Sequence, residues 1–278
     1  MPTKVLLLGA TGLLGFAIKN FAGFECLYSP TRKDLDLNYF RIIQEYLKLH
    51  NFDLIINCTG YNVVDEAESD YENCYYLNCL VPEFIAKTLF ELNPKAKLIQ
   101  FSSDYVFDGK NANGYLEDSP KSPISKYGLS KSIGEDLILK ANPNSYIVRV
   151  SWLFGPGKSN FVDKIITKHK NSDKIVIVDD QFGKPTYTLD IAKSLKNVIC
   201  NRPGIYHLPS EGVASWYELA KNALLKYDSN SEIQSCKTED LNSFATRPKY
   251  SILINSKLPE SPSYEVGLTD YITNYIQA

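Results

Sequence analysis

Short apolar segments alternate with longer amphipathic ones along the first half of the chain. The apolar segments run without polar alternation over Val5–Leu8, 26–29, Leu54–Asn57 and 98–102. Continuous apolar strands are typical of a parallel sheet that is covered on both faces. The segments between them have helical periodicity over 12–22, 39–50 and 81–92. The pattern therefore predicts an α/β fold with a doubly wound parallel sheet.

The same rhythm continues through a predicted helix over 125–140 and a predicted strand over 146–150, and then it loosens. Turn-forming residues crowd together beyond that point, at 155–157, 183–185 and 202–204. We therefore expect two parts. A main α/β domain would span residues 1–152, and a smaller lobe would span residues 153–278, partly interleaved with the last strands of the sheet.

The composition narrows the class of protein. The 278 residues include 30 basic and 32 acidic side chains, which give a formal net charge of −2, and 44% are hydrophobic. Without a basic cluster there is no electrostatic basis for tight non-specific nucleic-acid binding, and the apolar content argues against disorder. A chain of this length can bury a core without a metal or a disulfide.

The six cysteines show no C-x-x-C spacing, which favours free thiols in a reducing compartment. The apolar run over 5–18 has about the length of a signal-peptide core, but its three glycines and its helical continuation into Lys19 argue against one. No stretch of the sequence is long and apolar enough to span a bilayer. We expect a cytoplasmic protein that has neither a membrane nor a nucleic acid as its partner.

Three glycines surround the start of the first predicted helix. Gly9, Gly12 and Gly15 form G-x-x-G-x-x-G directly after a predicted strand, close to the G-x-G-x-x-G dinucleotide fingerprint. Glycine allows the tight turn, the approach of a pyrophosphate to the backbone and the close packing of helix on strand. The helix N-terminus then faces the phosphate charge. A structural loop is the alternative, but the position between strand and helix favours a dinucleotide site.

The residues after the second predicted strand bear on which dinucleotide binds. An acid about 20 residues beyond the fingerprint favours a free ribose hydroxyl, and Asp34 and Asp36 stand near that distance. Arg32 and Lys33 precede them where the adenosine ribose should lie, and a cation there favours the 2′-phosphate of NADP. We expect NADP(H), while NAD(H) stays open because both cations could instead belong to a solvated loop.

Tyr127 and Lys131 form a Y-x-x-x-K pair on one face of the helix predicted over 125–140. A phenol can protonate a carbonyl group that is being reduced, and an ammonium about 4 Å away would attract the phenolate by roughly 4 kcal/mol. That attraction would lower the pKa of Tyr127 toward the working pH. The pair alone is weak evidence in a chain with 19 tyrosines, but it gains weight beside a dinucleotide turn. Ser102 and Ser103 end the preceding strand, where a hydroxyl can polarise a substrate carbonyl or merely cap a turn.

Ten segments together resemble the extended short-chain dehydrogenase/reductases and, within them, the dTDP-4-dehydrorhamnose reductase family. They cover nearly the whole chain: GATGLLG at 9–15, DLDL at 34–37, LIINCTGYNVVDEAES at 54–69, SSDYVF at 102–107, YGLSK at 127–131, RVSWLFG at 149–155, SNF at 159–161, DQFGKPT at 180–186, GIYHL at 204–208 and ATRPKYS at 245–251. The last four are the most diagnostic. The resemblance implies a Rossmann-like doubly wound parallel sheet with a smaller C-terminal α/β substrate lobe.

The resemblance also implies roles for single residues. Tyr127 would be the proton donor, Lys131 its partner and a contact to the nicotinamide ribose, and Ser103 the third catalytic residue, at a position where the family commonly has threonine. Tyr127 and Lys131 would also contact the cofactor. The glycine fingerprint and the family resemblance together imply further cofactor contacts at Gly9, Thr11, Gly12, Leu13, Gly15, Arg32, Asp36, Leu37, Gly60, Tyr61 and Asn62. The deoxysugar would contact Val64, Ser103, Asp104, Tyr105 and Trp152. The indole of Trp152 would offer a flat wall, although an ordinary core position suits it equally well.

The strand-end sequence SSDYVF bears on the reaction. Relatives that dehydrate a sugar nucleotide have an acid where Tyr105 stands, and the combined epimerase/reductases of GDP-sugars have a cysteine where Asp104 stands. Neither group is present, so the resemblance implies NADPH-dependent reduction of the C4 ketone of a nucleotide-linked 4-dehydro-6-deoxysugar. The first expectation is dTDP-4-dehydro-L-rhamnose, reduced to dTDP-L-rhamnose for polysaccharide biosynthesis. A reductase for another nucleotide deoxysugar and a non-catalytic dinucleotide-binding subunit stay open as alternatives.

Metal chemistry finds no support in the sequence. The three histidines, His50, His169 and His207, lack the spacing of metal ligands. Acids at 66, 68, 70 and 72 do not share a helix face. We therefore expect no metal site. The sequence leaves the oligomeric state open, with a homodimer among the candidates.

Overall fold

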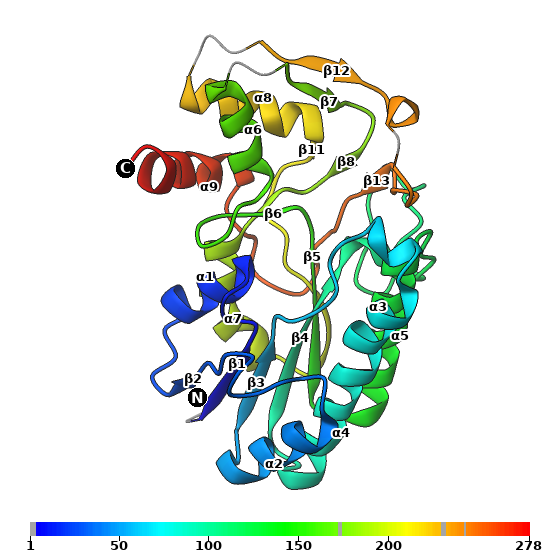
Figure 1. The fold of residues 1–278 in the computed structure, drawn as a ribbon, viewed down its shortest axis with the longest axis vertical. Helices are drawn as coiled ribbons and strands as arrows, with labels where there is room; N and C mark the ends of the chain where they lie inside the picture. Colours follow the sequence, from blue (N-terminus) through cyan, green and yellow to red (C-terminus); the bar gives the residue numbers. More distant parts are fainter. Residues whose placement is uncertain (1–3, 172–173, 229–231, 242) are drawn as a thin grey trace.

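A six-stranded parallel sheet is the framework of the computed structural model, which describes residues 4–171, 174–228, 232–241 and 243–278 (Figure 1). The strands lie in the order β10-β5-β4-β3-β1-β2, and each pairing between neighbours is parallel. Their bounds are Val5–Leu8 (β1), Leu27–Tyr28 (β2), Leu54–Asn57 (β3), Lys97–Ser103 (β4), Ser145–Val150 (β5) and Gly204–His207 (β10). The predicted α/β fold with a doubly wound parallel sheet is confirmed.

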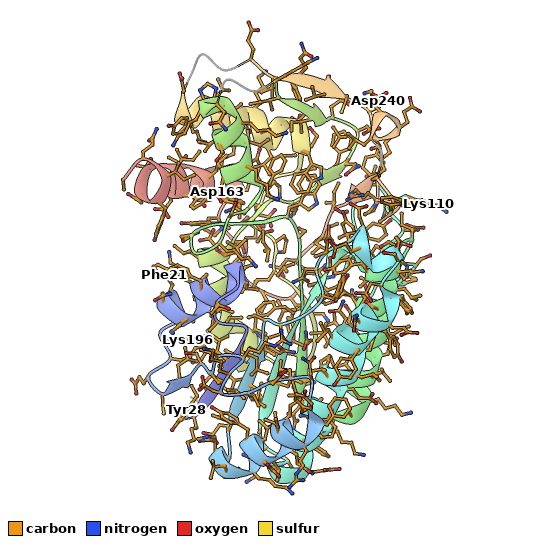
Figure 2. All side chains as sticks on the ribbon, viewed as in Figure 1. Phe21, Tyr28, Lys110, Asp163, Lys196 and Asp240 are labelled. Atoms are coloured by element: carbon orange, nitrogen blue, oxygen red, sulfur yellow. The ribbon has the colours of Figure 1, made fainter. Side chains whose placement is uncertain are left out.

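Helices cover both faces of the sheet. One face packs against α1 (Leu13–Phe21) and α7 (Thr188–Cys200), and the other against α2 (Phe40–His50), α4 (Val81–Leu92) and α5 (Lys126–Ala141). Figure 2 labels Phe21 of α1 and Lys196 of α7, which lie on the same side of the sheet. Successive strand residues point to opposite faces, so Leu6 packs with α2 and α4 while Leu7 packs with α1 and α7. This two-sided burial explains why the strands are continuously apolar.

The strand order reverses beside β1. From β1 the chain first forms β2 on one side, and then it crosses to β3 on the other side. In open parallel sheets, ligands bind outside the carboxyl ends of the strands at such a point. The segments that follow β1, β3 and β4 begin at Gly9, Cys58 and Asp104, so the predicted glycine turn and the predicted catalytic serine meet at this edge.

The second part of the chain forms a smaller layer beyond the carboxyl edge of the sheet, at the top of Figure 1. Its elements are β6 (Leu153–Phe154), α6 (Phe161–Lys170), β7 (Val176–Val178), β8 (Phe182–Gly183), β9 (Thr186–Tyr187), β11 (Ala214–Ser215), α8 (Trp216–Tyr227), β12 (Gln234–Cys236), β13 (Tyr250–Ser251) and α9 (Tyr264–Tyr271). They form three small sheets, β11-β8-β13, β12-β7 and β6-β9. The division of the chain at residue 152 stays a prediction, and α7 and β10 are the later segments that lie with the main sheet.

Several short turns complete the chain. The 3₁₀ turns are η1 (Glu66–Glu68), η3 (Asp104–Val106) and η4 (Thr238–Asp240), and the π-helical turns are η2 (Tyr76–Leu80) and η5 (Ile272–Ile276). The short helix α3 (Tyr71–Tyr75), η2 and α4 follow one another without a break, so the helix predicted over 81–92 extends a longer helical run.

Three further findings concern the described residues. No helix among them is long and apolar enough to cross a membrane. No group of three or more His, Cys, Asp or Glu side chains within this part of the chain could hold a metal ion. The six cysteines are free thiols.

A buried ion pair ties α5 to the sheet. Glu135 of α5 and Arg149 of β5 are each 1% exposed, and Nε and Nη2 of the arginine donate to the two carboxylate oxygens at 2.8 and 2.7 Å. Ser102 of β4 donates to the same carboxylate at 2.6 Å, and the Lys121 ammonium lies 3.4 Å from it. The Nη1 atom of Arg149 lies 3.2 Å from Nε2 of His207 in β10. Charges are buried in proteins when they are paired, so this pair fixes how α5 lies on the strands.

We predict that Arg149→Met lowers the free energy of unfolding by about 3–5 kcal/mol, because Glu135 keeps its buried charge and loses its main partner. Urea unfolding followed by circular dichroism measures the change. The double variant Glu135→Gln/Arg149→Met is the matched control and should lose less than Arg149→Met alone. A loss below about 1 kcal/mol in the single variant would show that the pair contributes little.

Candidate active site

The glycine turn between β1 and α1 is built for close backbone approach. Gly9 has φ +79°, in the left-handed region that favours glycine. A Cβ on Gly15 would lie 2.0 Å from the Gly9 carbonyl oxygen, so only glycine lets α1 begin this close to the strand. Gly12 caps α1 without a side-chain hydrogen bond, and the first-turn N–H groups of a helix have no partner within it. These residues fit a pyrophosphate, which such a helix N-terminus attracts.

Two clefts adjoin this turn. The first has a volume of about 410 Å³, and the predicted cofactor residues that line it are Gly9, Thr11, Arg32, Asp36, Leu37 and Gly60. The second has a volume of about 340 Å³ and is lined by the predicted cofactor residues Gly12, Leu13, Gly15 and Asn62, together with Ser103, Asp104, Tyr127, Lys131 and Trp152. Thr59 lines both clefts. A dinucleotide that crosses the turn would therefore have its adenosine in the first cleft and its nicotinamide in the second.

Three predicted site residues lie elsewhere. Tyr61, Val64 and Tyr105 pack in a small cluster with Tyr127 rather than lining either cleft. The Tyr105 ring meets the Tyr127 ring edge to face, with centroids 5.7 Å apart. These side chains therefore pack against Tyr127, the predicted proton donor.

The three predicted catalytic residues converge on the second cleft from two elements. Ser103 ends β4, while Tyr127 and Lys131 lie one turn apart in α5, and all three are at most 8% exposed. The Ser103 hydroxyl donates to Oδ1 of Asp104 at 2.8 Å and accepts the backbone N–H of Tyr105 at 3.2 Å. Ser103 thus caps the turn η3 and also lines the cleft, and its catalytic role stays a prediction.

The expectation that Lys131 lowers the pKa of Tyr127 toward the working pH is wrong. Burial raises the pKa of Tyr127 well above its ordinary value, opposed by a hydrogen bond with Ser103. Burial also lowers the pKa of Lys131 to about 8. The Lys131 ammonium lies 5.8 Å from the centroid of the Tyr127 ring, and burial is the largest cause of the shift in the pKa of Tyr127. The phenol therefore keeps its proton.

Trp152 lines the cleft, but part of its flat surface is already used. Its ring stacks on Trp216 of α8 with centroids 3.7 Å apart and planes 6° apart. Gly183 approaches the indole so closely that an added Cβ would lie 2.6 Å from it. The backbone of Trp152 has φ +46°, an unusual value for a residue with a side chain. The flat wall expected from the sequence is therefore a stack of two indoles that joins the two parts of the chain.

Asn78, which the sequence patterns did not single out, holds the loop after β3 against α5. Its Oδ1 accepts the N–H of Tyr61 at 2.9 Å, and its Nδ2 donates to the Tyr61 carbonyl at 3.0 Å and to Oγ of Ser130 at 2.9 Å. A Cβ on Gly60 would lie 2.8 Å from Oδ1 of Asn78 and 2.9 Å from Nζ of Lys131. The signal available in the sequence was a lone amide within an apolar helical run, and π-helical turns such as η2 often occur at functional sites.

Comparison with known proteins places the chain in a family. The model of the RmlD substrate binding domain matches residues 3–276. The chain is 33% identical to the spore coat polysaccharide biosynthesis protein SpsK of Bacillus subtilis (strain 168), over 99% of this chain and 97% of that protein. It is 33% identical to a dTDP-4-dehydrorhamnose reductase of Streptomyces griseus, over 91% of this chain and 86% of that protein.

A solved structure extends the likeness to three dimensions. The dTDP-4-dehydrorhamnose reductase of Bacillus anthracis str. Ames, solved in complex with NADP, superposes with a TM-score of 0.93 at 31% identity, and the match covers 100% of both chains. The family resemblance drawn from the sequence motifs is confirmed.

We predict that Lys131→Met makes the cofactor-free protein more stable at pH 7. The pKa of Lys131 falls from 10.5 to about 8 on folding, so the folded protein bears a desolvation cost of roughly 3 kcal/mol below pH 8. That cost disappears as the pH rises from about 8 to 10.5, because the folded lysine loses its proton before the unfolded one. The stability difference between variant and wild type should therefore shrink across this window in urea titrations.

Lys140→Met provides the control, because Lys140 is an exposed lysine of the same helix and should change stability by less than about 0.5 kcal/mol. A Lys131→Met protein less stable than wild type at pH 7 would contradict the assignment of a desolvation cost to this ammonium.

Proposed function

The chain belongs to the RmlD substrate-binding-domain family, and on this premise we propose that it is an NADPH-dependent dTDP-4-dehydrorhamnose reductase. It is an oxidoreductase that converts the C4 ketone of dTDP-4-dehydro-L-rhamnose to the alcohol of dTDP-L-rhamnose. One observation carries the proposal: a single cleft is lined by the first turn of α1 and by Ser103, Tyr127 and Lys131. A binding subunit would not need these three side chains together at the nicotinamide end of a dinucleotide site.

Each catalytic group has a distinct part in the reduction. Bound NADPH supplies the hydride that adds to C4. The Tyr127 phenol gives its proton to the C4 oxygen, and the Ser103 hydroxyl donates a hydrogen bond to the same oxygen. The raised pKa of Tyr127 suits proton transfer that follows hydride addition. The phenol stays protonated until the C4 oxygen has become strongly basic. Lys131, one turn along α5, stabilises the phenolate that remains.

The adenosine cleft supports NADPH over NADH. Arg32 lines it, and its side chain is 79% exposed, with Nε 3.8 Å from Asp36, so the guanidinium is free to turn toward a 2′-phosphate. The solved relative from Bacillus anthracis contains NADP.

We propose that the nucleotide half of the substrate binds in a third cleft. This cleft, about 410 Å³ in volume, is lined by Asp65 and by residues of the second part of the chain that include Phe161, Gln181, Trp216 and Arg247. Trp216 lines it while its stacking partner Trp152 lines the catalytic cleft, so the two clefts share one aromatic stack. A nucleotide sugar could therefore place its sugar beside Tyr127 and its base beside Phe161.

We also propose that the enzyme works in the cytoplasm. Its six free cysteines are consistent with a reducing compartment.

We predict that Tyr127→Phe lowers kcat by about 10²–10⁴-fold, because the proton donor is removed while the ring remains. The measurement is the loss of reduced-nicotinamide absorbance with dTDP-4-dehydro-L-rhamnose. Tyr75→Phe, at a tyrosine of α3 that lines none of the three clefts, is the control. Turnover by Tyr127→Phe near the wild-type rate would refute the proton-donor role. Tight NADPH binding by the wild type without turnover of any 4-keto nucleotide sugar would favour a binding subunit.

We predict that Arg32→Ala weakens NADPH binding by about tenfold and leaves NADH binding nearly unchanged, because only NADPH has the 2′-phosphate that the guanidinium meets. Cofactor affinities follow from nicotinamide fluorescence titrations. Lys33→Ala is the matched control, since Lys33 is exposed and does not line the cleft. Equal losses for both cofactors would assign the 2′-phosphate contact to another residue.

A further inference from the structure

Asp104 is a buried carboxyl group that the mechanism above does not use. It follows Ser103 directly, is 3% exposed and lines the catalytic cleft. Its Oδ1 receives the Ser103 hydroxyl at 2.8 Å. Its Oδ2 is buried and receives no hydrogen bond of standard geometry from the described residues, although the buried hydroxyl of Ser251 in β13 is near enough to favour the charged form. The protonation state of Asp104 therefore determines which hydrogen bond it can make with Ser103.

The Ser103 hydroxyl can make three hydrogen bonds, one as donor and two as acceptor. One lone pair already accepts the backbone N–H of Tyr105 at 3.2 Å. The proton goes to Oδ1 of Asp104 at 2.8 Å, and Ser103 also lowers the pKa of Tyr127. The direction of the hydrogen bond between Asp104 and Ser103 therefore decides what Ser103 offers to Tyr127 and to a ketone.

The two states of Asp104 have opposite effects. An ionised Asp104 can only accept, so the Ser103 proton points at it, as the 2.8 Å contact shows. That proton is then not available to the ketone. A neutral Asp104 can donate to Ser103 instead. The Ser103 proton is then free to meet the C4 oxygen, beside the proton of Tyr127.

We propose that Asp104 is a positioning residue that acts through Ser103, and that its neutral carboxylic acid is the form that directs the Ser103 hydroxyl toward the ketone. The inference rests on the proposed reduction and adds the protonation state in which it occurs. No covalent bond of Asp104 to a ligand is involved; its proton only sets the direction of two hydrogen bonds.

Burial shifts Asp104 toward its neutral form, while the hydrogen bonds that it receives favour the charged form. Burial raises the pKa of Asp104 to about 6, against the hydroxyls of Ser251 and Ser103, which lower it. The titratable groups that face it are the phenols of Tyr105 from its own turn and Tyr127 from α5, and burial raises the pKa of both. Neither phenol supplies a positive charge that would hold the carboxylate.

No charged side chain among the described residues forms a hydrogen bond or an ion pair with Asp104. Asp65 and Arg247, whose charges act on Tyr105, form an ion pair with each other at 2.7 Å. Lys131 of α5 lies beyond the Tyr127 ring, 5.8 Å from its centroid. A bound nucleotide sugar would exclude water from the cleft and bring negative phosphates, and both effects stabilise the neutral acid further.

If neutral Asp104 is the competent form, the activity falls as the pH rises. A carboxyl group with a raised pKa is neutral below that pKa, so the competent fraction falls about tenfold for each pH unit above it. Wild-type kcat/KM, which reports the enzyme before the sugar binds, should decline above about pH 6. The decline in kcat should begin at a higher pH, because the bound sugar favours the neutral acid.

Two substitutions of Asp104 distinguish a hydrogen bond donated to Ser103 from the mere presence of a side chain at position 104. Asp104→Asn is neutral at every pH, and its amide can donate to Ser103, so its kcat/KM should be flat from about pH 6 to 8 and should match or exceed that of wild type at the upper end. Asp104→Ala has no donor and should lose about tenfold or more at every pH. A wild-type rate that rises through this range, or an Asn variant as impaired as the Ala variant, would overturn the proposal. The Asn variant preserves size, and its urea unfolding curve shows whether the fold is intact.

A measurement without turnover separates this inference from the proposed function. Carbon-13 NMR of the aspartate carboxyl groups, with Asp104 assigned by the resonance that Asp104→Asn removes, gives its titration midpoint in the protein alone. A midpoint near 6 supports the proposal, and one near the ordinary value of 3.8 overturns it whatever reaction the enzyme catalyses. A midpoint near 6 in a protein that does not reduce dTDP-4-dehydro-L-rhamnose contradicts the proposed function and leaves the neutral acid standing.

Discussion

The need to pair one buried charge organises this molecule. Tyr127, Lys131 and Glu135 are spaced by four along α5 and therefore share its inward face. Arg149 is the fully buried cation that pairs with Glu135, so the pair fixes this face of α5 against the sheet. The bond from Ser102 to Glu135 holds the end of β4 in the same network, one residue before Ser103. A structural ion pair thus aligns both halves of the catalytic site.

Loss of water is the dominant electrostatic effect in the cleft itself. Burial raises the pKa of Tyr127, lowers that of Lys131 and raises that of Asp104, so each of the three groups is shifted toward its neutral form. A cleft that destabilises the ionised forms of its side chains does not stabilise a charged ground state. It suits a reaction in which charge develops briefly on an oxygen that a hydroxyl and a phenol can reach.

Features that depend on neighbours in sequence could be predicted, and those that depend on neighbours in space could not. The apolar strands, the Gly9–Gly15 turn and the spacing of Tyr127 and Lys131 follow from local geometry. The stack of Trp152 on Trp216 joins residues far apart in the chain, and the expected pKa of Tyr127 was wrong because a sequence does not show how much water a side chain loses. Asn78 was overlooked because its hydrogen bonds reach a separate loop and helix.

The placement of α7 and β10 affects how the chain folds during its synthesis. Until residues 204–207 emerge, β5 is an unpaired edge of the sheet, and until 188–200 emerge, the apolar residues of α1 and of one sheet face lack their cover. Exposed edges and apolar faces are where nascent chains associate wrongly. The first three quarters of the protein must therefore be synthesised before its framework can close, which makes the later segments partners in folding as well as in binding.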